Sequence, residues 1–130
     1  MGVKMKPEDY AKSGSEFAHQ TALFMWAAMV KQQWPELDLM FAIKNEEKSG
    51  SKIVGGRFKA SGVKADVPDI FLPVARQGCH GLFIEMKRPG KKARTGQAEF
   101  GQKMKNNGYG WICCDNWELA KNVLIQYLTV

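Results

Sequence analysis

Two carboxylates and one lysine stand at a spacing that could form a reactive centre. Asp69 follows Pro68, and the run Glu85-Met86-Lys87 comes sixteen positions later. The segment Gly81–Lys87 is short and apolar and is followed by Arg88-Pro89-Gly90, which predicts a β-strand. Because successive side chains of a strand point to opposite faces, the Glu85 and Lys87 side chains are expected on one face, and the Met86 side chain on the other.

These residue types suit the hydrolysis of a phosphodiester bond. The reaction needs a nucleophilic hydroxide and a positive charge against the developing negative charge, and a bound Mg²⁺ or Mn²⁺ ion meets both needs. One or two carboxylates are enough to hold Mg²⁺, so Asp69 and Glu85 are candidate ligands. Lys87 could stabilise negative charge or lower the pKa of the attacking water. Taken alone, Glu85 and Lys87 also fit an exposed ion pair, and Pro68-Asp69 also fits a turn.

A helix expected over Glu16–Gln33 supplies a further acid. Glu16 lies in its first turn, where the helix dipole favours an anion, and shares a face with Gln20. Ser13 or Ser15 can cap the helix, which is expected to end before Pro35. Glu16 is therefore either part of the site or only an acid at a helix start. The apolar side chains with helical spacing are Phe17, Leu23, Phe24, Ala27, Ala28 and Val30.

Gln97 is expected in the first turn of a second helix, with Thr95 as its cap. A polar side chain there can point back at the end of the preceding strand and reach the two carboxylates. The alternative is an ordinary solvated glutamine on a helix surface.

Positive charge surrounds the segment that follows Lys87, and the chain has a formal net charge of +6. Such charge next to a carboxylate cluster suits a polyanionic partner. Arg57 and Lys59 lie in a basic, glycine-rich loop that could follow a nucleic-acid backbone or could be a solvated hairpin. The cations near the candidate site are Arg88, Lys91, Lys92, Arg94, Lys103 and Lys105, opposed only by Glu99.

Together these segments resemble the VRR-Nuc family (virus-type replication-repair nucleases), a branch of the PD-(D/E)XK nuclease superfamily. The segments that carry the resemblance are Glu16-x-x-x-Gln20, Gly62-Val63-x-x-Asp66-Val67-Pro68-Asp69, Glu85-Met86-Lys87, Gln97 and Gly108-Tyr109. The resemblance implies an α/β fold with a restriction-endonuclease-like core, in which helices flank a central mixed β-sheet.

The resemblance also implies roles for single residues. Asp69, Glu85 and the main-chain carbonyl of Met86 would bind the metal, and Lys87 would be the catalytic lysine. Glu16 and Gln97 would be supporting residues of the site, with Glu16 as a further candidate ligand. One departure is Ala65-Asp66, where the family usually has a small or basic residue and then glycine. Asp66 either adds a ligand or caps a turn.

The implied activity is that of a Mg²⁺- or Mn²⁺-dependent DNA endonuclease selective for DNA structure. Small stand-alone members, typical of phages and prophages, resemble Holliday-junction resolvases, so the expected partners are branched DNA and a second copy in a homodimer. The alternatives are a flap or duplex nuclease with the same chemistry, or a non-catalytic nucleic-acid-binding module. A structural or inhibitor protein, a third class, would need a large apolar surface.

Length and composition set the remaining expectations. The 130 residues predict a flexible tail over 1–12 and one nuclease domain over 13–130. No apolar run approaches the length that crosses a bilayer, and no glycine-rich motif of a nucleotide site is present, so neither a membrane nor a nucleotide cofactor is expected. The odd number of cysteines, three, favours a reducing cytoplasm. The resemblance to phage and prophage proteins implies the cytoplasm of a bacterial cell or a phage-infected host.

Further strands are expected around Leu39–Ile43, Asp69–Leu72 and Gly110–Cys113, with a last helix over Trp117–Leu128 that begins at Asp115 or Asn116. The helix between the Glu85 and Trp111 strands predicts that these two strands run parallel.

Overall fold

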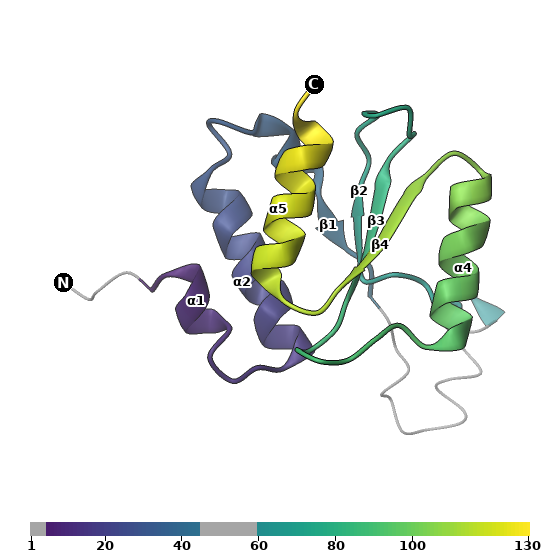
Figure 1. Ribbon diagram of the computed structural model, residues 1–130, viewed down its shortest axis with the longest axis horizontal. Coiled ribbons are helices and arrows are strands. Elements are labelled where there is room, and N and C mark those ends of the chain that lie inside the picture. The colour runs from purple at the N-terminus through teal and green to yellow at the C-terminus, as the bar shows by residue number, and fades with distance from the viewer. Residues whose placement is uncertain (1–4, 45–59) are drawn as a thin grey trace.

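The computed structural model describes residues 5–44 and 60–130 of the chain. Figure 1 shows helices beside one sheet of strands, as expected for an α/β protein, and the two kinds of element alternate only toward the C-terminus. In chain order the elements are α1 (Pro7–Tyr10), α2 (Glu16–Met29), the 3₁₀ helix η1 (Pro35–Leu39), β1 (Phe41–Ala42), β2 (Ile70–Leu72), β3 (Leu82–Met86), α4 (Thr95–Asn106), β4 (Gly110–Cys114) and α5 (Trp117–Leu128).

The strands form one mixed sheet in the order β1-β2-β3-β4. β1 pairs antiparallel with β2, and β2 pairs antiparallel with β3. β3 and β4 run parallel, with Glu85 opposite Cys113 in the register, and α4 connects them. The expected parallel pair and the expected mixed sheet are both confirmed.

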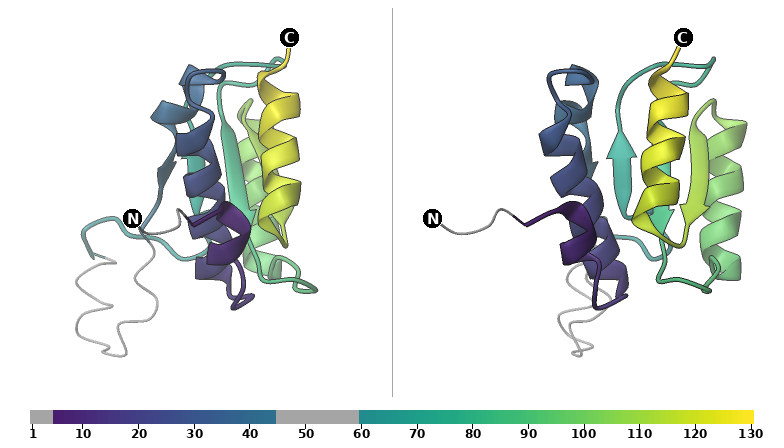
Figure 2. Two further views of the ribbon diagram at one scale, coloured as in Figure 1. Left: turned by 90° about the vertical axis from the view of Figure 1, so that its left-hand side faces the viewer. Right: turned by 60° about the vertical axis from the view of Figure 1, so that its left-hand side comes forward.

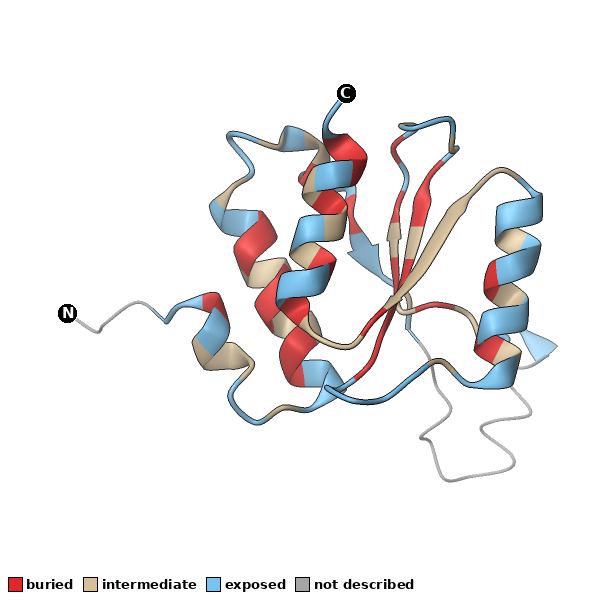
Figure 3. Cartoon of the chain, in the orientation of Figure 1, coloured by how far each residue is buried: buried red, intermediate tan, exposed pale blue. Residues whose placement is uncertain are grey.

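Helices cover both faces of this sheet. Figure 2 shows the sheet between the pair α2 and α5 on one side and α4 on the other. In Figure 3 the buried parts of α2 and α5 face each other and the strands. The largest fully buried apolar side chains of the core are Leu23, Ile70, Leu72, Ile84, Met86 and Leu124.

Side chains that alternate along the strands separate this core from the other face of the sheet. Ile84 and Met86 of β3 are fully buried in the core. On the opposite face, Phe83 stacks on Phe71 of β2 with 4.3 Å between ring centroids. Glu85 is two residues after Phe83 on the same strand, so its side chain lies on the same face of the sheet, outside the apolar core.

Two of the three proposed helix starts are confirmed in detail. The Ser15 hydroxyl accepts a hydrogen bond from the Ala18 N–H at 3.0 Å, and Asn116 Oδ1 accepts one from the Leu119 N–H at 2.8 Å. The third was wrong, because Thr95 is the first residue of α4 and Arg94 is its N-cap. There the side chain of Gln97 does the capping, since its Oε1 accepts from the Arg94 N–H at 2.8 Å.

The element ends on both sides of Pro35 differ from those expected. α2 ends at Met29 instead of Gln33, and a turn follows in which the Trp34 N–H donates to the Val30 carbonyl at 2.8 Å. Proline disfavours a helical conformation in the residue before it, and Pro35 itself begins η1. Because η1 runs to Leu39, the following strand starts at Phe41 and not at Leu39.

The N-terminal segment is partly folded against the domain. Pro7–Tyr10 form α1, which contacts α2, and Pro7 is buried. Thus part of the segment 1–12 packs on the second helix. Within the described residues, no helix has the length and apolar character that crossing a membrane requires.

Candidate active site

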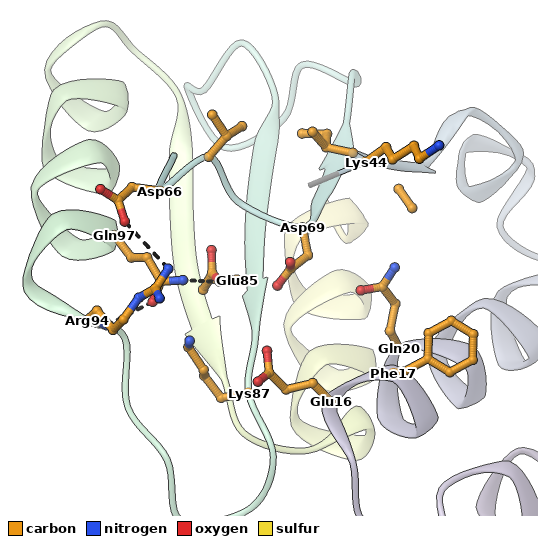
Figure 4. Close-up of a pocket in the computed structure, with 13 residues that line it drawn as sticks. Glu16, Phe17, Gln20, Lys44, Asp66, Asp69, Glu85, Lys87, Arg94 and Gln97 are labelled. Carbon is orange, nitrogen blue, oxygen red and sulfur yellow. Dashed lines mark hydrogen bonds and ion pairs between the residues drawn. The ribbon is translucent and has the colours of Figure 1, made fainter. Parts of the chain in front are cut away.

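The structure brings together residues that are far apart in the sequence. Glu16, Asp69, Glu85, Lys87 and Gln97 all line one cavity of about 500 Å³. Figure 4 shows their side chains converging from α2, from the segment before β2, from β3 and its end, and from α4.

Glu85 and Lys87 are both removed from solvent. Glu85 is 2% exposed and Lys87 is 9% exposed, and both side chains point into the cavity, whereas Met86 between them is fully buried in the core. This burial excludes the alternative of an exposed ion pair on an ordinary strand. A buried carboxylate and a buried ammonium on one face of a strand end instead suggest a functional site.

The carboxylate of Glu85 is satisfied on one side only. Oε1 accepts a hydrogen bond from Nε2 of Gln97 at 2.9 Å. Oε2 is buried and has no hydrogen-bond partner. A protonated Glu85 can donate a hydrogen bond to the neighbouring carboxylate of Asp69, whereas an ionised Glu85 leaves Oε2 without a partner.

Electrostatics make the ionised form of Glu85 unfavourable. Burial is the main cause that raises its pKa from 4.5 to about 9, and the neighbouring carboxylate of Asp69 raises it further. Lys87 opposes this shift, while the negative charge of Glu16 adds a smaller upward contribution. A site with this balance favours either a proton or a cation beside Glu85.

Asp69 is anchored to the neighbouring strand. Its Oδ2 accepts a hydrogen bond from the Met86 N–H at 2.8 Å, which ties the residue before β2 to the end of β3. On the other side of Met86, the Lys87 N–H donates to the Cys114 carbonyl at 2.8 Å. The backbone that carries Glu85 and Lys87 is thus held between Asp69 and β4.

Glu16 lies at the more exposed rim of the cavity. The first turn of α2 places it there together with Gln20, four residues later on the same face. Figure 4 shows Glu16 on the side of the cavity where Lys87 enters.

Asp66 forms another wall of the cavity. Its backbone has φ +69°, a left-handed conformation typical of a turn, which fits the turn interpretation of this residue. Its Oδ1 lies 3.7 Å from an Arg94 guanidinium nitrogen, and its carboxylate packs so closely on Gly96 that a side chain at Gly96 would overlap it. These contacts bring the turn before Asp69 against the start of α4. A ligand role for Asp66 stays untested.

Cations line a second groove beside the site. This groove of about 430 Å³ shares Glu16, Phe17, Lys87 and Arg94 with the first cavity and adds Arg88, Lys91 and Lys92. Arg57 and Lys59, the other two proposed nucleic-acid contacts, lie outside the described residues.

Asp115 holds the loop that carries these cations, a role that the sequence analysis missed. Its Oδ2 accepts a hydrogen bond from the Gly90 N–H at 3.0 Å, and this bond is the main cause that lowers the pKa of Asp115. Gly90 has φ +85°, so the turn depends on glycine. The only sequence signal was that Asp115 precedes a helix.

Two further residues of the cavity were missed or misassigned. Lys44 lines it from the segment after β1, and no motif pointed to this lysine. Phe17 was grouped with the apolar side chains of its helix, yet it is 79% exposed and lines the cavity. Its neighbours in sequence are the cap Ser15 and the acid Glu16, so its place in the first helical turn was the available signal.

The side chains fit a small, hard divalent cation. No group of three or more His, Cys, Asp or Glu side chains in residues 5–44 and 60–130 is arranged to hold a metal. Mg²⁺, however, usually keeps several waters and binds through only one or two carboxylates. The pair Asp69 and Glu85, with Oε2 of Glu85 unpartnered, meets that smaller requirement.

The comparison with solved structures agrees with the motifs. No family model matches the sequence, and no curated protein matches it either. Among solved structures, one described as "VRR_NUC domain protein" is similar, with a TM-score of 0.74 and 27% sequence identity. The match covers 88% of this chain and 88% of that one. In its mixed sheet with flanking helices, the order of its motifs and this shared structure, the chain resembles the VRR-Nuc family of nucleases.

Proposed function

We propose that the protein is a Mg²⁺- or Mn²⁺-dependent endonuclease that hydrolyses phosphodiester bonds in DNA. The observation that carries the proposal is the buried, unpartnered Oε2 of Glu85 in one cavity with Asp69 and Lys87. A buried carboxylate oxygen without a partner costs free energy. A divalent cation between Glu85 and Asp69 would remove this cost and the repulsion between the two carboxylates.

Asp69 and Glu85 would hold the ion, with the main-chain carbonyl of Met86 as a third ligand and Glu16 as a further one. When bound, the ion supplies positive charge at the phosphate and an activated water. Asp69 is positioned for this role by the Met86 N–H, and Glu85 is oriented by Gln97. Lys87 would stabilise the negative charge that develops on the phosphate, or lower the pKa of the attacking water.

The groove beside the site supports DNA as the substrate. Arg88, Lys91 and Lys92 line it, and the phosphate backbone of a nucleic acid is the polyanion that such a row of cations binds. The choice of DNA over RNA as the substrate rests on the resemblance to the VRR-Nuc family. A pure binding module is disfavoured, because carboxylates next to the phosphate would repel it unless a cation were bound.

Within this activity we propose four-way junctions as the substrate and a homodimer as the active form. A dimer with twofold symmetry would place one active site on each of two strands of a junction, which has a matching pseudo-twofold axis. This step rests on the resemblance to small stand-alone members of the family. Cleavage confined to flaps or duplex DNA would support the assignment as a nuclease and contradict the assignment as a junction resolvase.

Cleavage of a labelled four-way junction, a flap and a linear duplex tests the proposal. Wild-type protein, Glu85→Ala and the control Glu118→Ala, an exposed acid on α5, are compared in Mg²⁺, Mn²⁺ or EDTA. We expect paired, symmetric nicks on the junction that require the metal, disappear in Glu85→Ala and persist in Glu118→Ala. Junction binding without any cleavage would instead assign the chain to the binding modules.

A further inference from the structure

Phe17 is a large aromatic residue that the fold leaves in solvent next to the candidate site. It is 79% exposed in the first turn of α2. An exposed ring gains little from burial, so packing in the core does not account for a phenylalanine at this position. Single exposed apolar residues are common on protein surfaces, and it is the location of this one that carries information.

That location is the boundary between two functional hollows. Phe17 lines both the cavity that holds Asp69 and Glu85 and the groove that holds Lys91 and Lys92. Figure 4 shows the Phe17 ring beside Gln20, on the flank of the cavity across from Gln97 and Arg94. Met29, at the other end of the same helix, is 59% exposed and lines neither hollow.

A nucleic acid bound in the proposed way would bring a base to this flank. A phosphate held at Lys87, with its backbone along the cations of the groove, leaves the attached sugars and bases at the rim. Aromatic side chains bind bases by stacking on their faces, whatever the base. In a continuous duplex both faces of each base are already covered by neighbouring bases, whereas an unstacked base has a free face.

We propose that Phe17 stacks on an unstacked base next to the scissile phosphate. The ring thereby makes the protein prefer DNA in which base stacking is interrupted at the cut, such as a flap or a branch point, over continuous duplex. This inference rests on the proposed nuclease function and adds to it the feature of DNA that the site reads.

A contact between two copies of the chain is the competing use of an exposed ring, and the charges disfavour it. Arg88, Lys91, Lys92 and Arg94 line the groove that Phe17 borders. A second copy brought to this surface by its own equivalent face would bring the same positive charges, and like charges repel. A polyanion is complementary to these charges.

Three variants test the inference: Phe17→Ala, Phe17→Trp and the control Met29→Ala. Dissociation constants for a flap and for a continuous duplex of the same sequence are measured in Ca²⁺, which is expected to support binding without turnover. We expect wild type to prefer the flap, and Phe17→Ala to lose roughly tenfold of that preference. Phe17→Trp keeps an aromatic face and should keep the preference for the flap. Met29→Ala should show the wild-type ratio of the two dissociation constants.

Further outcomes separate failure of the inference from failure of the proposed function. Cleavage of the flap by wild type in Mn²⁺, together with an unchanged preference in Phe17→Ala, would overturn the role of Phe17 and leave the nuclease intact. A sedimentation coefficient that changes in Phe17→Ala without a change in preference would assign the ring to a contact between copies, and so overturn the inference. Absence of cleavage on every substrate by wild type would overturn the nuclease itself.

Discussion

The side-chain amide of Gln97 connects the first turn of α4 to the carboxylate of Glu85. Its Oε1 accepts a hydrogen bond from the Arg94 N–H at 2.8 Å, and its Nε2 donates to Oε1 of Glu85 at 2.9 Å. Because the first bond fixes which end of the amide carries the oxygen, the second can only be a donation to Glu85. The carboxylate is thereby held with Oε2 as the oxygen that remains for another partner.

Replacing Gln97 should therefore weaken metal binding without removing a ligand. In Gln97→Ala the Glu85 carboxylate loses the group that orients it, and we expect the affinity for Mn²⁺ to fall about 10- to 100-fold. Isothermal titration calorimetry measures this affinity. Gln102→Ala, an exposed glutamine on the same helix, is the control and should bind Mn²⁺ as wild type does. Wild-type affinity in Gln97→Ala would mean that Gln97 only caps the helix.

Lys87→Ala should separate metal binding from catalysis. Its ammonium lies in the cavity with both carboxylates but is not a ligand, so Mn²⁺ should still bind. Single-turnover cleavage should slow by roughly 10²- to 10³-fold, the usual effect of removing one charge-stabilising donor. Lys31→Ala, an exposed lysine beyond the end of α2, should cleave at the wild-type rate. Loss of the calorimetric Mn²⁺ signal in Lys87→Ala would assign Lys87 a structural role instead.

Asp69→Asn should abolish cleavage and keep DNA binding. The amide oxygen can still accept the hydrogen bond from the Met86 N–H, so the local fold is expected to survive. The variant loses a negative charge that binds the metal and repels the phosphate, and affinity for branched DNA should therefore stay the same or increase. Electrophoretic mobility shift and cleavage assays measure the two properties, with Asp38→Asn as an exposed control. Full cleavage by Asp69→Asn would show that Asp69 is not a residue of the active site.

Stability of the metal-free protein should decrease with rising pH because of Glu85. The folded protein keeps a proton on Glu85 until the pKa of about 9, whereas the unfolded chain loses it near 4.5. Between these values the folded state binds more protons than the unfolded state, so the free energy of unfolding falls as pH rises. Glu85→Gln has no such proton and should lose this part of the pH dependence.

Urea unfolding in EDTA between pH 5 and pH 9 checks this expectation, and the quantity to compare is the difference between wild type and Glu85→Gln. At pH 8 the variant should be the more stable of the two without metal. Added Mn²⁺ should raise the stability of wild type and have little effect on the variant. If the free energies of unfolding of the two proteins changed with pH in the same way, ionisation of Glu85 would not destabilise the fold, and the prediction would be wrong.

The sequence allowed the framework to be predicted where signals are local. The Trp117–Leu128 helix and its start at Asp115 or Asn116 follow from periodicity and capping residues. The helix is confirmed, and Asn116 is the residue that caps it. Periodicity could not place Phe17, because it tells which side chains share a helix face but not where the helix extends beyond the core. The Gly90–Asp115 hydrogen bond joins residues distant in sequence, and no local pattern encodes such a contact.

Gly101 of α4 sets how closely this helix approaches the sheet, and Gly101→Ala tests that contact. Inside a helix, alanine is normally more stabilising than glycine by about 0.5–1 kcal/mol. Here a Cβ would lie 2.7 Å from Cγ of Trp111 and still closer to other atoms of the indole ring, so the ring or the helix must move. Overpacking of this kind costs about 1–3 kcal/mol, which exceeds the helical gain.

We therefore expect Gly101→Ala to lower the midpoint of urea unfolding, whereas Lys103→Ala, at an exposed position of the same helix, should change it little. Because α4 also carries Gln97, moving the helix away from β4 would lengthen the bond from Gln97 to Glu85 and reduce the affinity for Mn²⁺. A stabilised Gly101→Ala with wild-type Mn²⁺ affinity would show that the indole adapts without moving the helix. Loss of both properties would show that the close contact between α4 and the sheet also positions the candidate metal ligand.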